Sequence, residues 1–334
     1  MNAPESVSVI IPVFNSEHSI AACIDSVLAQ THPPGEIIVV NDGSTDDTDT
    51  ILHAYGEKIT TIRQRNQGQG AARNTGIRAA TGDFIAFLDA DDYWEPLFLE
   101  RCVAFFRGHA RAVAVLTGWT KIIDHSRREI VPPIMNSGSE RPLHPMIISD
   151  FFRFWMEQDH VQTGAIMIRH DVIQEAGLQR EDLRISQDLE YWMLIATYGK
   201  WGFIPEPLFV SNSRLNARRN WIDRYRTRRH LCPSVESWQE RVVPRIPDRE
   251  WHYFEGIRGR IAANFSHSKI LSGSTDEAKD ILKKYGNTMP VNLLTRLMRF
   301  GAGVGGPVWT GICQMIRIKE IVKGWKLQKI AAAS

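Results

Sequence analysis

The chain has 334 residues and a formal net charge of +2, with 43% of its residues hydrophobic and 23% charged. This composition indicates one large folded domain with a smaller appendage, and it excludes disordered and collagen-like chains. The four cysteines form no Cys-x-x-Cys pair, which argues against a disulfide framework or a zinc site and favours a reducing compartment. There is no basic signal segment and no apolar run of about 20 residues, so we expect a cytoplasmic protein without a membrane-spanning helix.

The first hundred residues alternate between short β-rich runs and segments with helical periodicity. We expect strands at 7–14, 36–40, 59–62 and 84–88, and helices at 20–28, 46–55, 70–80 and 96–106, the first of them capped by Asn15 and Ser16. Four alternations with short connections predict right-handed βαβ crossovers. The expected fold is therefore α/β and Rossmann-like, a mostly parallel sheet flanked by helices.

Beyond residue 107 the pattern is looser. We expect strands at 112–117 and 163–169, a loop at 125–142, helices at 146–156 and 188–198, and mostly helix from 218 onward. The chain is therefore divided into a catalytic domain, 1–215, with a nucleotide-binding half, 1–106, and an acceptor half, 107–215. A mostly helical C-terminal extension, 216–334, follows it.

Polar residues follow three of the predicted strands, namely Asn15, Asp42 and Asp89. In an open parallel sheet, ligands bind outside the carboxyl ends of the strands. We therefore expect these three residues, which are distant in sequence, to converge on one crevice.

Three carboxylates follow the fourth strand in the segment Asp89-Ala90-Asp91-Asp92. At an extended strand end, residues i and i+2 point to the same side, so Asp89 and Asp91 can face one ligand. Mg²⁺ or Mn²⁺, bound by one or two carboxylates with phosphates in the other positions, suits this pattern. An isolated Asp-x-Asp is more often a solvated acidic turn, but the position after a strongly apolar strand favours a metal and phosphate site.

Two further segments combine polar residues with glycines. In the turn 41–46, Asp42 can accept hydrogen bonds from a base or ribose, while Ser44 or Asp46 caps the next helix. In 66–76, the glycines permit close backbone approach, the helix N-terminus favours anions, and Arg73 offers a fork for phosphate or base oxygens. The alternatives are an ordinary turn and a tightly packed helix.

Four segments occur in order and at matching separations: Pro12–Asn15, Val40–Asp46, Ala72–Gly76 and Phe87–Asp92. Together they resemble the pattern of glycosyltransferase family 2, which has the GT-A fold, and the resemblance covers about residues 6–210. It implies inverting transfer of a sugar from a nucleotide-diphosphate donor, with UDP as the usual nucleotide. The resemblance also implies which residues bind the donor. Asp42 would contact the base, Arg73 the nucleotide, and Asp89 with Ala90 would lie near the ribose, while the base is bordered by Pro12, Val13, Phe14 and Glu17. Asp91, with Asp89, would bind a divalent metal ion, Mg or Mn.

Inversion requires a general base that deprotonates the acceptor hydroxyl. Asp188 lies at the start of a predicted helix and resembles the base of the family's Glu-Asp motif, although Gln187 stands where the family often has Glu. Without the resemblance, Asp188 would be interpreted as a first-turn carboxylate stabilised by the helix dipole. Glu190 is interpreted as supporting structure or an acceptor contact.

Further residues are weaker candidates. His160 and Gln162 are considered for the acceptor pocket, Arg214, Arg218 and Arg219 for closure over the diphosphate, and Trp94, Trp119 and Trp155 for sugar stacking. Solvated arginines and tryptophans packed in the core are the favoured alternatives.

The expected role is synthesis of a cell-surface glycan or polysaccharide, with a glycan or lipid-linked acceptor. A sugar-phosphate nucleotidyltransferase is one alternative, but 12–20 lacks the Gly, Arg and Lys of its phosphate loop. A non-catalytic nucleotide-sugar-binding protein is another, which Gln187 leaves open. Nucleic-acid binding is not expected, because acidic residues balance the basic ones outside the tail.

The tail from Val291 to Ser334 carries seven Lys or Arg and one Glu among many apolar residues. A basic amphipathic segment can lie on the inner face of the cytoplasmic membrane, which would suit a lipid-linked acceptor. A helical cap packed on the catalytic domain is an equal alternative. A homodimer is a further expectation.

Overall fold

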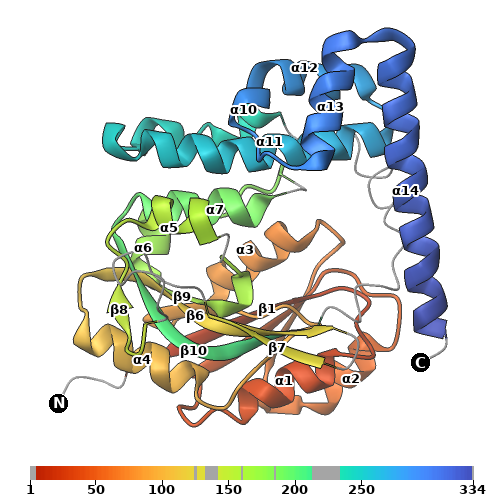
Figure 1. Cartoon of the computed structure of the whole chain (residues 1–334). Helices are drawn as coiled ribbons and strands as arrows, with labels where there is room; N and C mark the ends of the chain where they lie inside the picture. Colours follow the sequence, from red (N-terminus) through yellow and green to blue (C-terminus); the bar gives the residue numbers. More distant parts are fainter. Residues whose placement is uncertain are drawn as a thin grey trace. The chain divides into compact units, whose positions relative to one another are not determined.

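The computed structural model describes residues 5–123, 126–131, 142–158, 161–183, 186–212 and 234–332 (Figure 1). The chain divides into two compact units, one formed by Met1–Glu181 with Tyr191–Leu215 and the other by Asp182–Glu190 with Asn216–Ser334. The division falls inside helix α7 (Gln187–Ala196), between Glu190 and Tyr191. The predicted domain limit after residue 215 lies outside the described residues and stays a prediction.

Parallel strands form the first part of the sheet, in the order β3-β2-β1-β4. These strands are β1 (Val7–Val13), β2 (Glu36–Asn41), β3 (Thr60–Arg63) and β4 (Phe84–Phe87). The helices between them are α1 (Ile20–Leu28), α2 (Thr48–Ala54) and α3 (Gln69–Ala79), with a short 3-10 helix at Gly56–Lys58. The predicted alternation of strand and helix is confirmed in this part of the chain.

The later strands make the sheet mixed. β9 (Ile166–Arg169) lies between β4 and β6 (Ala112–Ile123) and is antiparallel to both. β10 (Lys200–Asn212) is parallel to β6 and antiparallel to β5 (Tyr93–Trp94) and β8 (Met146–Ile147), while β7 (Ser126–Ile130) is antiparallel to β6. The helices of this part are α4 (Phe98–Gly108), α5 (Phe151–Gln158), α6 (His170–Ala176) and α7, with a 3-10 helix at Thr163–Ala165.

Three local predictions are wrong. The loop expected at 125–142 contains β7, because pairing with the long strand β6 extends a segment that is rich in charge. The helix expected from 146 begins only at Phe151, because Met146 and Ile147 pair with β10. Asn15 and Ser16 do not cap α1, which begins at Ile20.

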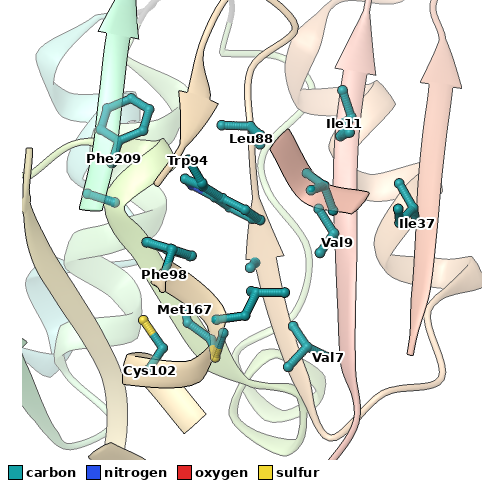
Figure 2. Close-up of a cluster of buried hydrophobic side chains, with 14 of the residues drawn as sticks. Val7, Val9, Ile11, Ile37, Leu88, Trp94, Phe98, Cys102, Met167 and Phe209 are labelled. Atoms are coloured by element: carbon teal, nitrogen blue, oxygen red, sulfur yellow. The ribbon is translucent and has the colours of Figure 1, made fainter. Parts of the chain in front are cut away.

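Alternate residues of β1 pack against two different layers. Val7, Val9 and Ile11 lie in the large core cluster that includes side chains of α1 and α4 (Figure 2). Ile10 faces α3 instead, where a Cβ on Gly76 would lie 2.4 Å from Ile10 Cγ2. The helix can approach the strand this closely because glycine has no side chain. The sheet is therefore covered on both faces, and the predicted α/β class is confirmed.

The second unit is mainly helical, as predicted. Its elements are α10 (Val235–Gln239), α11 (Trp251–Ser272), α12 (Thr275–Tyr285), α13 (Leu293–Val304) and α14 (Gly306–Ala332), with 3-10 helices at Val243–Arg245, Asp248–Glu250 and Gly286–Thr288. α13 begins with a capping box between Asn292 and Thr295. No helix among the described residues is both long enough and apolar enough to cross a membrane.

Candidate active site

The loop after β1 is fastened to the loop after β2. The backbone N–H groups of Asn15 and Ser16 donate to the hydroxyls of Ser44 and Thr48, each at 3.0 Å. In return, Oδ1 of Asn15 accepts the N–H of Thr45 at 2.8 Å. Asn15 has a φ of 48°, in the left-handed region where asparagine is well tolerated. The carboxyl ends of the two strands therefore form one connected edge.

Asp42 follows β2 directly and is buried, at 3% exposure. Its Oδ1 accepts hydrogen bonds from Gln64 Nε2 and the Gln67 N–H, both at 2.8 Å, and its Oδ2 accepts the Gly68 N–H at 2.7 Å. A charged acceptor with three donors is a strong arrangement. Asp42 thus holds the glycine-rich backbone that leads into α3, while its predicted contact with a base stays a prediction.

Two residues of α3 bind Asp89 at the end of β4. Gln69 and Arg73 are four residues apart and lie on the same face of the helix. Gln69 Nε2 and Arg73 Nη2 donate to Oδ1 of Asp89, at 2.8 and 2.7 Å. The Nε and Nη1 atoms of Arg73 are buried and have no partner in the described part of the chain. Because such orphaned donors are rare, they are candidates for contact with an anionic ligand.

Asp92, whose role the sequence leaves open, binds the end of β10. Its Oδ1 accepts the N–H of Asn212 at 2.8 Å. Burial raises the pKa of the Asp92 carboxyl well above its usual range, and the neighbouring carboxylates of Asp91 and Asp89 raise it further. Asp92 therefore attaches the acidic turn, residues 89–92, to the sheet, and its side chain lies close to two other carboxylates.

The carboxylate oxygens of the acidic turn are the kind of ligand that hard divalent cations prefer. Among the residues that the structure describes, no group of three or more His, Cys, Asp or Glu side chains is arranged to hold a metal ion. Mg²⁺ does not need such a group, since it commonly binds one or two carboxylates together with water and phosphate oxygens. The Sγ of Cys23 donates to the carbonyl oxygen of Asp89 at 3.6 Å, and burial and then the nearby aspartates raise the pKa of its thiol well above its usual range.

Asp188 lies in the first turn of α7, in the second unit. Its side chain is half-buried, and its Oδ1 accepts the N–H of Leu189 at 2.9 Å. A carboxylate at this position is favoured by the positive end of the helix dipole. Its role as a base stays a prediction.

The other residues predicted to bind the nucleotide lie at the ends of β1 and β4. Pro12 and Val13 are buried within β1, whereas Phe14 is 36% exposed beyond the strand. Glu17 Oε2 accepts the N–H of Asp47 at 3.0 Å. Ala90 is buried, between the two aspartates that are expected to hold the metal.

The three tryptophans that were considered for sugar stacking, Trp94, Trp119 and Trp155, are all buried. Trp94 stacks on Phe98 with ring centroids 4.3 Å apart and donates to the carbonyl of Gly164, so packing accounts for it. Gln162 is half-buried, just before Thr163–Ala165. His160, Arg214, Arg218 and Arg219 lie outside the described residues.

Asn74 has a structural role that the sequence did not reveal. Its Nδ2 donates to the carbonyl of Gln179 and to Oε1 of Glu181, at 2.8 and 2.9 Å, and its Oδ1 accepts the Gln179 N–H at 2.9 Å. The side chain is buried. Asn74 therefore fixes the segment around Gln179 to α3, and no spacing rule links residues so far apart in sequence.

Comparison with known proteins decides the family. The profile described as "Glycosyl transferase family 2" matches residues 8–175, about half of the chain. The chain belongs to glycosyl transferase family 2. The family predicted from the four motifs is thus confirmed, and with it the enzyme class, a glycosyltransferase.

Curated relatives in this family are similar over part of their length. An uncharacterized glycosyltransferase of Rickettsia typhi is 32% identical over 226 residues, 66% of this chain and 69% of that protein. One from Rickettsia prowazekii is 33% identical over 189 residues, 56% of this chain and 57% of its own length. One from Nostoc sp. is 43% identical over 129 residues, 36% of this chain and 40% of its own length. The chain therefore spans between 40% and 69% of these relatives.

Solved structures of S. aureus TarS share the fold. TarS residues 1–349 in complex with UDP align with a TM-score of 0.66 and 16% identity, over 93% of this chain and 90% of that chain. The same fragment in complex with UDP-GlcNAc aligns with a TM-score of 0.62 and 19% identity, over the same shares. The likeness confirms the GT-A fold that the family resemblance implied.

Proposed function

We propose that this family 2 glycosyltransferase transfers a sugar, with inversion, from a nucleotide-diphosphate donor to a hydroxyl group. UDP is the favoured nucleotide, and the acceptor is a glycan or a lipid-linked sugar in cell-surface glycan or polysaccharide synthesis. One observation carries the proposal: the Asp42 carboxylate that holds the glycine-rich loop and the Arg73–Asp89 ion pair both lie at the carboxyl ends of the parallel strands. Ligands of open α/β sheets bind at this edge.

The nucleotide half is assigned as follows. Pro12, Val13, Phe14 and Glu17 border the base, Asp42 accepts a hydrogen bond from it, and Asp89 with Ala90 lies on the ribose side. Arg73 stabilises the anionic nucleotide through its guanidinium, whose orphaned Nε and Nη1 atoms support the assignment.

Asp91, with Asp89, would hold Mg²⁺ or Mn²⁺, which would neutralise the charge on the leaving diphosphate. The choice is supported by the sequence of three carboxylates at the end of an apolar strand, since one or two carboxylates with phosphate oxygens are the ligands that Mg²⁺ prefers. Asp188 would take the proton from the acceptor hydroxyl as that oxygen attacks the anomeric carbon. The bond from the sugar to the diphosphate breaks in the same step, and inversion results.

A panel of UDP-, GDP- and dTDP-sugars tests donor and metal together by thermal shift, with and without Mn²⁺. A ligand that binds only the folded protein raises the melting temperature. We expect a metal-dependent rise for one donor class, reduced in Asp91→Asn. The absence of any rise across the whole panel would contradict the donor assignment, and a rise that is the same without metal would contradict the metal assignment.

The best donor then tests the base. Its hydrolysis, which is transfer of the sugar to water, is followed by release of the nucleotide diphosphate. Asp188→Asn should reduce turnover by about 10²–10⁴-fold, the usual contribution of a general base, while the donor-induced thermal shift persists. Asp150→Asn is the control, because its carboxylate also lies at a helix start and accepts a backbone N–H, that of Arg153. Turnover by Asp188→Asn equal to that of the wild type would refute the assignment of the base.

We also propose that the end of the chain contacts an anionic phospholipid surface. Leu293, Phe300 and Val304 share one exposed face of α13, since seven and eleven residues bring a helix back to the same side. Phe300 is 61% exposed, and Arg296 and Arg299 are also exposed on this helix.

α14 repeats this combination. Val308, Met315, Ile318 and Val322 are exposed at spacings of seven, three and four residues, and Lys319 is exposed beside them. Apolar side chains that enter the acyl boundary, with cations at the headgroups, are the chemistry of interfacial helices. The exposed apolar side chains of α13 and α14 therefore support contact with a lipid surface.

A further inference from the structure

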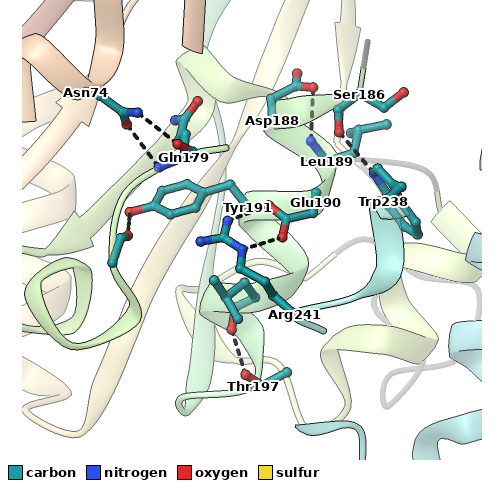
Figure 3. Close-up of polar contacts among 12 residues, drawn as sticks. Asn74, Gln179, Ser186, Asp188, Leu189, Glu190, Tyr191, Thr197, Trp238 and Arg241 are labelled. Atoms are coloured by element: carbon teal, nitrogen blue, oxygen red, sulfur yellow. Dashed lines mark hydrogen bonds and ion pairs between the residues drawn. The ribbon is translucent and has the colours of Figure 1, made fainter. Parts of the chain in front are cut away.

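Two contacts hold the chain on either side of Asp188. The carbonyl oxygen of Ser186 accepts a hydrogen bond from the indole N–H of Trp238 at 3.1 Å. The carboxylate of Glu190 accepts two from Arg241, with Nε 2.8 Å from Oε1 and Nη2 2.7 Å from Oε2 (Figure 3). All five residues belong to the second unit.

The two anchors lie symmetrically about the proposed base. Ser186 precedes Asp188 by two residues and Glu190 follows it by two, so the first turn of α7 is fixed from both sides. We propose that Trp238 and Arg241 are positioning residues that set the orientation of Asp188. This inference rests on the proposed function, because it assumes that Asp188 is the base.

The chemistry of the Glu190 contact favours a role in orientation. Glu190 and Trp238 are both completely buried, whereas the side chain of Arg241 is 30% exposed. A buried ion pair adds little stability over apolar residues of the same size, so its presence is weak evidence for a stabilising role. A bidentate guanidinium fixes direction as well as distance, which an ammonium group cannot do.

Ser186 supplies a second argument. Its φ is 58°, in the left-handed region that residues other than glycine rarely adopt. Strained backbone of this kind persists where surrounding contacts determine it, and it clusters at functional sites. The Trp238 indole, together with the N–H of Glu190 at 3.1 Å, holds the carbonyl of this residue.

The helix that carries Trp238 is itself held. Ser234 caps α10 by accepting the N–H of Ser237 at 3.0 Å. Glu236 of α10 accepts from Lys284 Nζ at 2.5 Å and from the Tyr285 hydroxyl at 2.7 Å, and both donors lie at the end of α12. The indole that binds Ser186 therefore lies on a helix that is itself fixed by its cap and by its contacts with α12, and Arg241 follows the end of that helix by two residues.

The test uses Trp238→Phe, which removes the indole donor and keeps an aromatic ring, and Arg241→Lys, which keeps the charge and loses the fork. Steady-state hydrolysis of the best donor from the nucleotide-sugar panel gives kcat and the donor KM. Each variant should lower kcat about ten- to hundredfold, as misplacement by about 1 Å does, and change the donor KM less than twofold. Trp251→Phe and Arg249→Lys, at exposed positions of the same unit, should leave both constants unchanged.

Thermal melts give the fraction of each variant that is folded at the assay temperature, and each apparent kcat is divided by that fraction. If Arg241→Lys does not fold, Trp238→Phe decides the question. Corrected kcat values equal to that of the wild type, or a donor KM that rises in proportion to the loss of kcat, would overturn the positioning role. Failure of the proposed base is seen separately, since Asp188→Asn would then turn over normally, and the positioning role would fall with it.

Discussion

The guanidinium of Arg73 lies 2.7 Å from a carboxylate oxygen of Asp89, and the arginine is almost completely buried. The pair joins α3 to the end of β4. It also leaves two guanidinium nitrogens, Nε and Nη1, without a partner in the described part of the chain, so the hydrogen bonding of the arginine is incomplete. A ligand with anionic oxygens would complete it.

Arg73→Met should therefore weaken both the fold and the site. The aspartate loses a charged partner in a partly buried position, and we expect the free energy of unfolding to fall by about 1–3 kcal/mol. Urea denaturation measures this loss, and thermal shift with the best donor should reveal a reduced stabilisation. Arg78→Met is the control on the same helix, since that arginine is exposed and pairs with Glu181 at 3.4 Å, so it should cost less than about 1 kcal/mol. Equal losses in the two variants would contradict the prediction.

Gly76→Ala should destabilise the first unit through overpacking. The added Cβ would meet the side chain of Ile10 at 2.4 Å, and the strand cannot move away from a covered sheet. We expect a loss of about 1–3 kcal/mol in urea denaturation. Gly311→Ala, in the interior of α14 with no atom within 4 Å of the added Cβ, should instead be neutral or stabilise by up to about 1 kcal/mol. A neutral Gly76→Ala would show that α3 can shift away from β1.

The contact of Glu236 with Lys284 and Tyr285 should make stability depend on acid pH. Burial alone would raise the pKa of Glu236, but the hydrogen bonds from Lys284 and Tyr285 lower it from 4.5 to about 2. A lowered pKa in the folded state gives stability that is fully present above pH 4.5 and is lost as the pH falls towards 2. The stability difference between wild type and Glu236→Gln should therefore shrink over this interval.

Urea denaturation at several pH values between 7 and 2.5 measures that difference. Lys284→Gln should diminish the pH-dependent part, because it removes one of the two donors to the carboxylate. A difference that stays constant from pH 7 to pH 2.5 would contradict the assignment.

The exposed faces of α13 and α14 predict binding to anionic vesicles. Phe300→Glu or Ile318→Glu should weaken co-sedimentation with phosphatidylglycerol vesicles at least tenfold, because burying a large apolar side chain contributes about 1.5–3 kcal/mol. Binding should also fall with added salt. Leu143→Glu, at a side chain that is 85% exposed in the first unit, should have no effect. No binding to any anionic vesicle would exclude the lipid surface and favour a protein partner for these helices.

The sequence was sufficient where local pattern and tertiary structure agree. β1, β2 and β4 are short, buried and apolar, so their period and their turns identify them, and the positions of Asp42 and Asp89 at the strand ends follow. β7 was missed because Ser126–Ile130 is polar and is extended only through pairing with β6. The insertion of β9 between β4 and β6 has no local signal at all.

The contacts around the candidate site were harder to predict for a different reason. The place of Asp42 at a strand end could be predicted, but its three donors in the protein, from Gln64, Gln67 and Gly68, could not. The donors lie more than twenty residues away on another loop, and side-chain partners at such separations obey no period. The same holds for Arg241 and Glu190, which are 51 residues apart.

The strand order also affects how the sheet can form while the chain is being synthesised. β4 gains its second neighbour only from β9, which comes much later in the sequence. At about 5–20 residues per second, ribosomal synthesis delivers β9 roughly 4–16 s after β4. During that interval one edge of a fully apolar strand has no partner, which is the condition for pairing with another nascent chain. A fragment that stops at residue 106 would keep this open edge permanently, so it should aggregate rather than fold as a separate nucleotide-binding module.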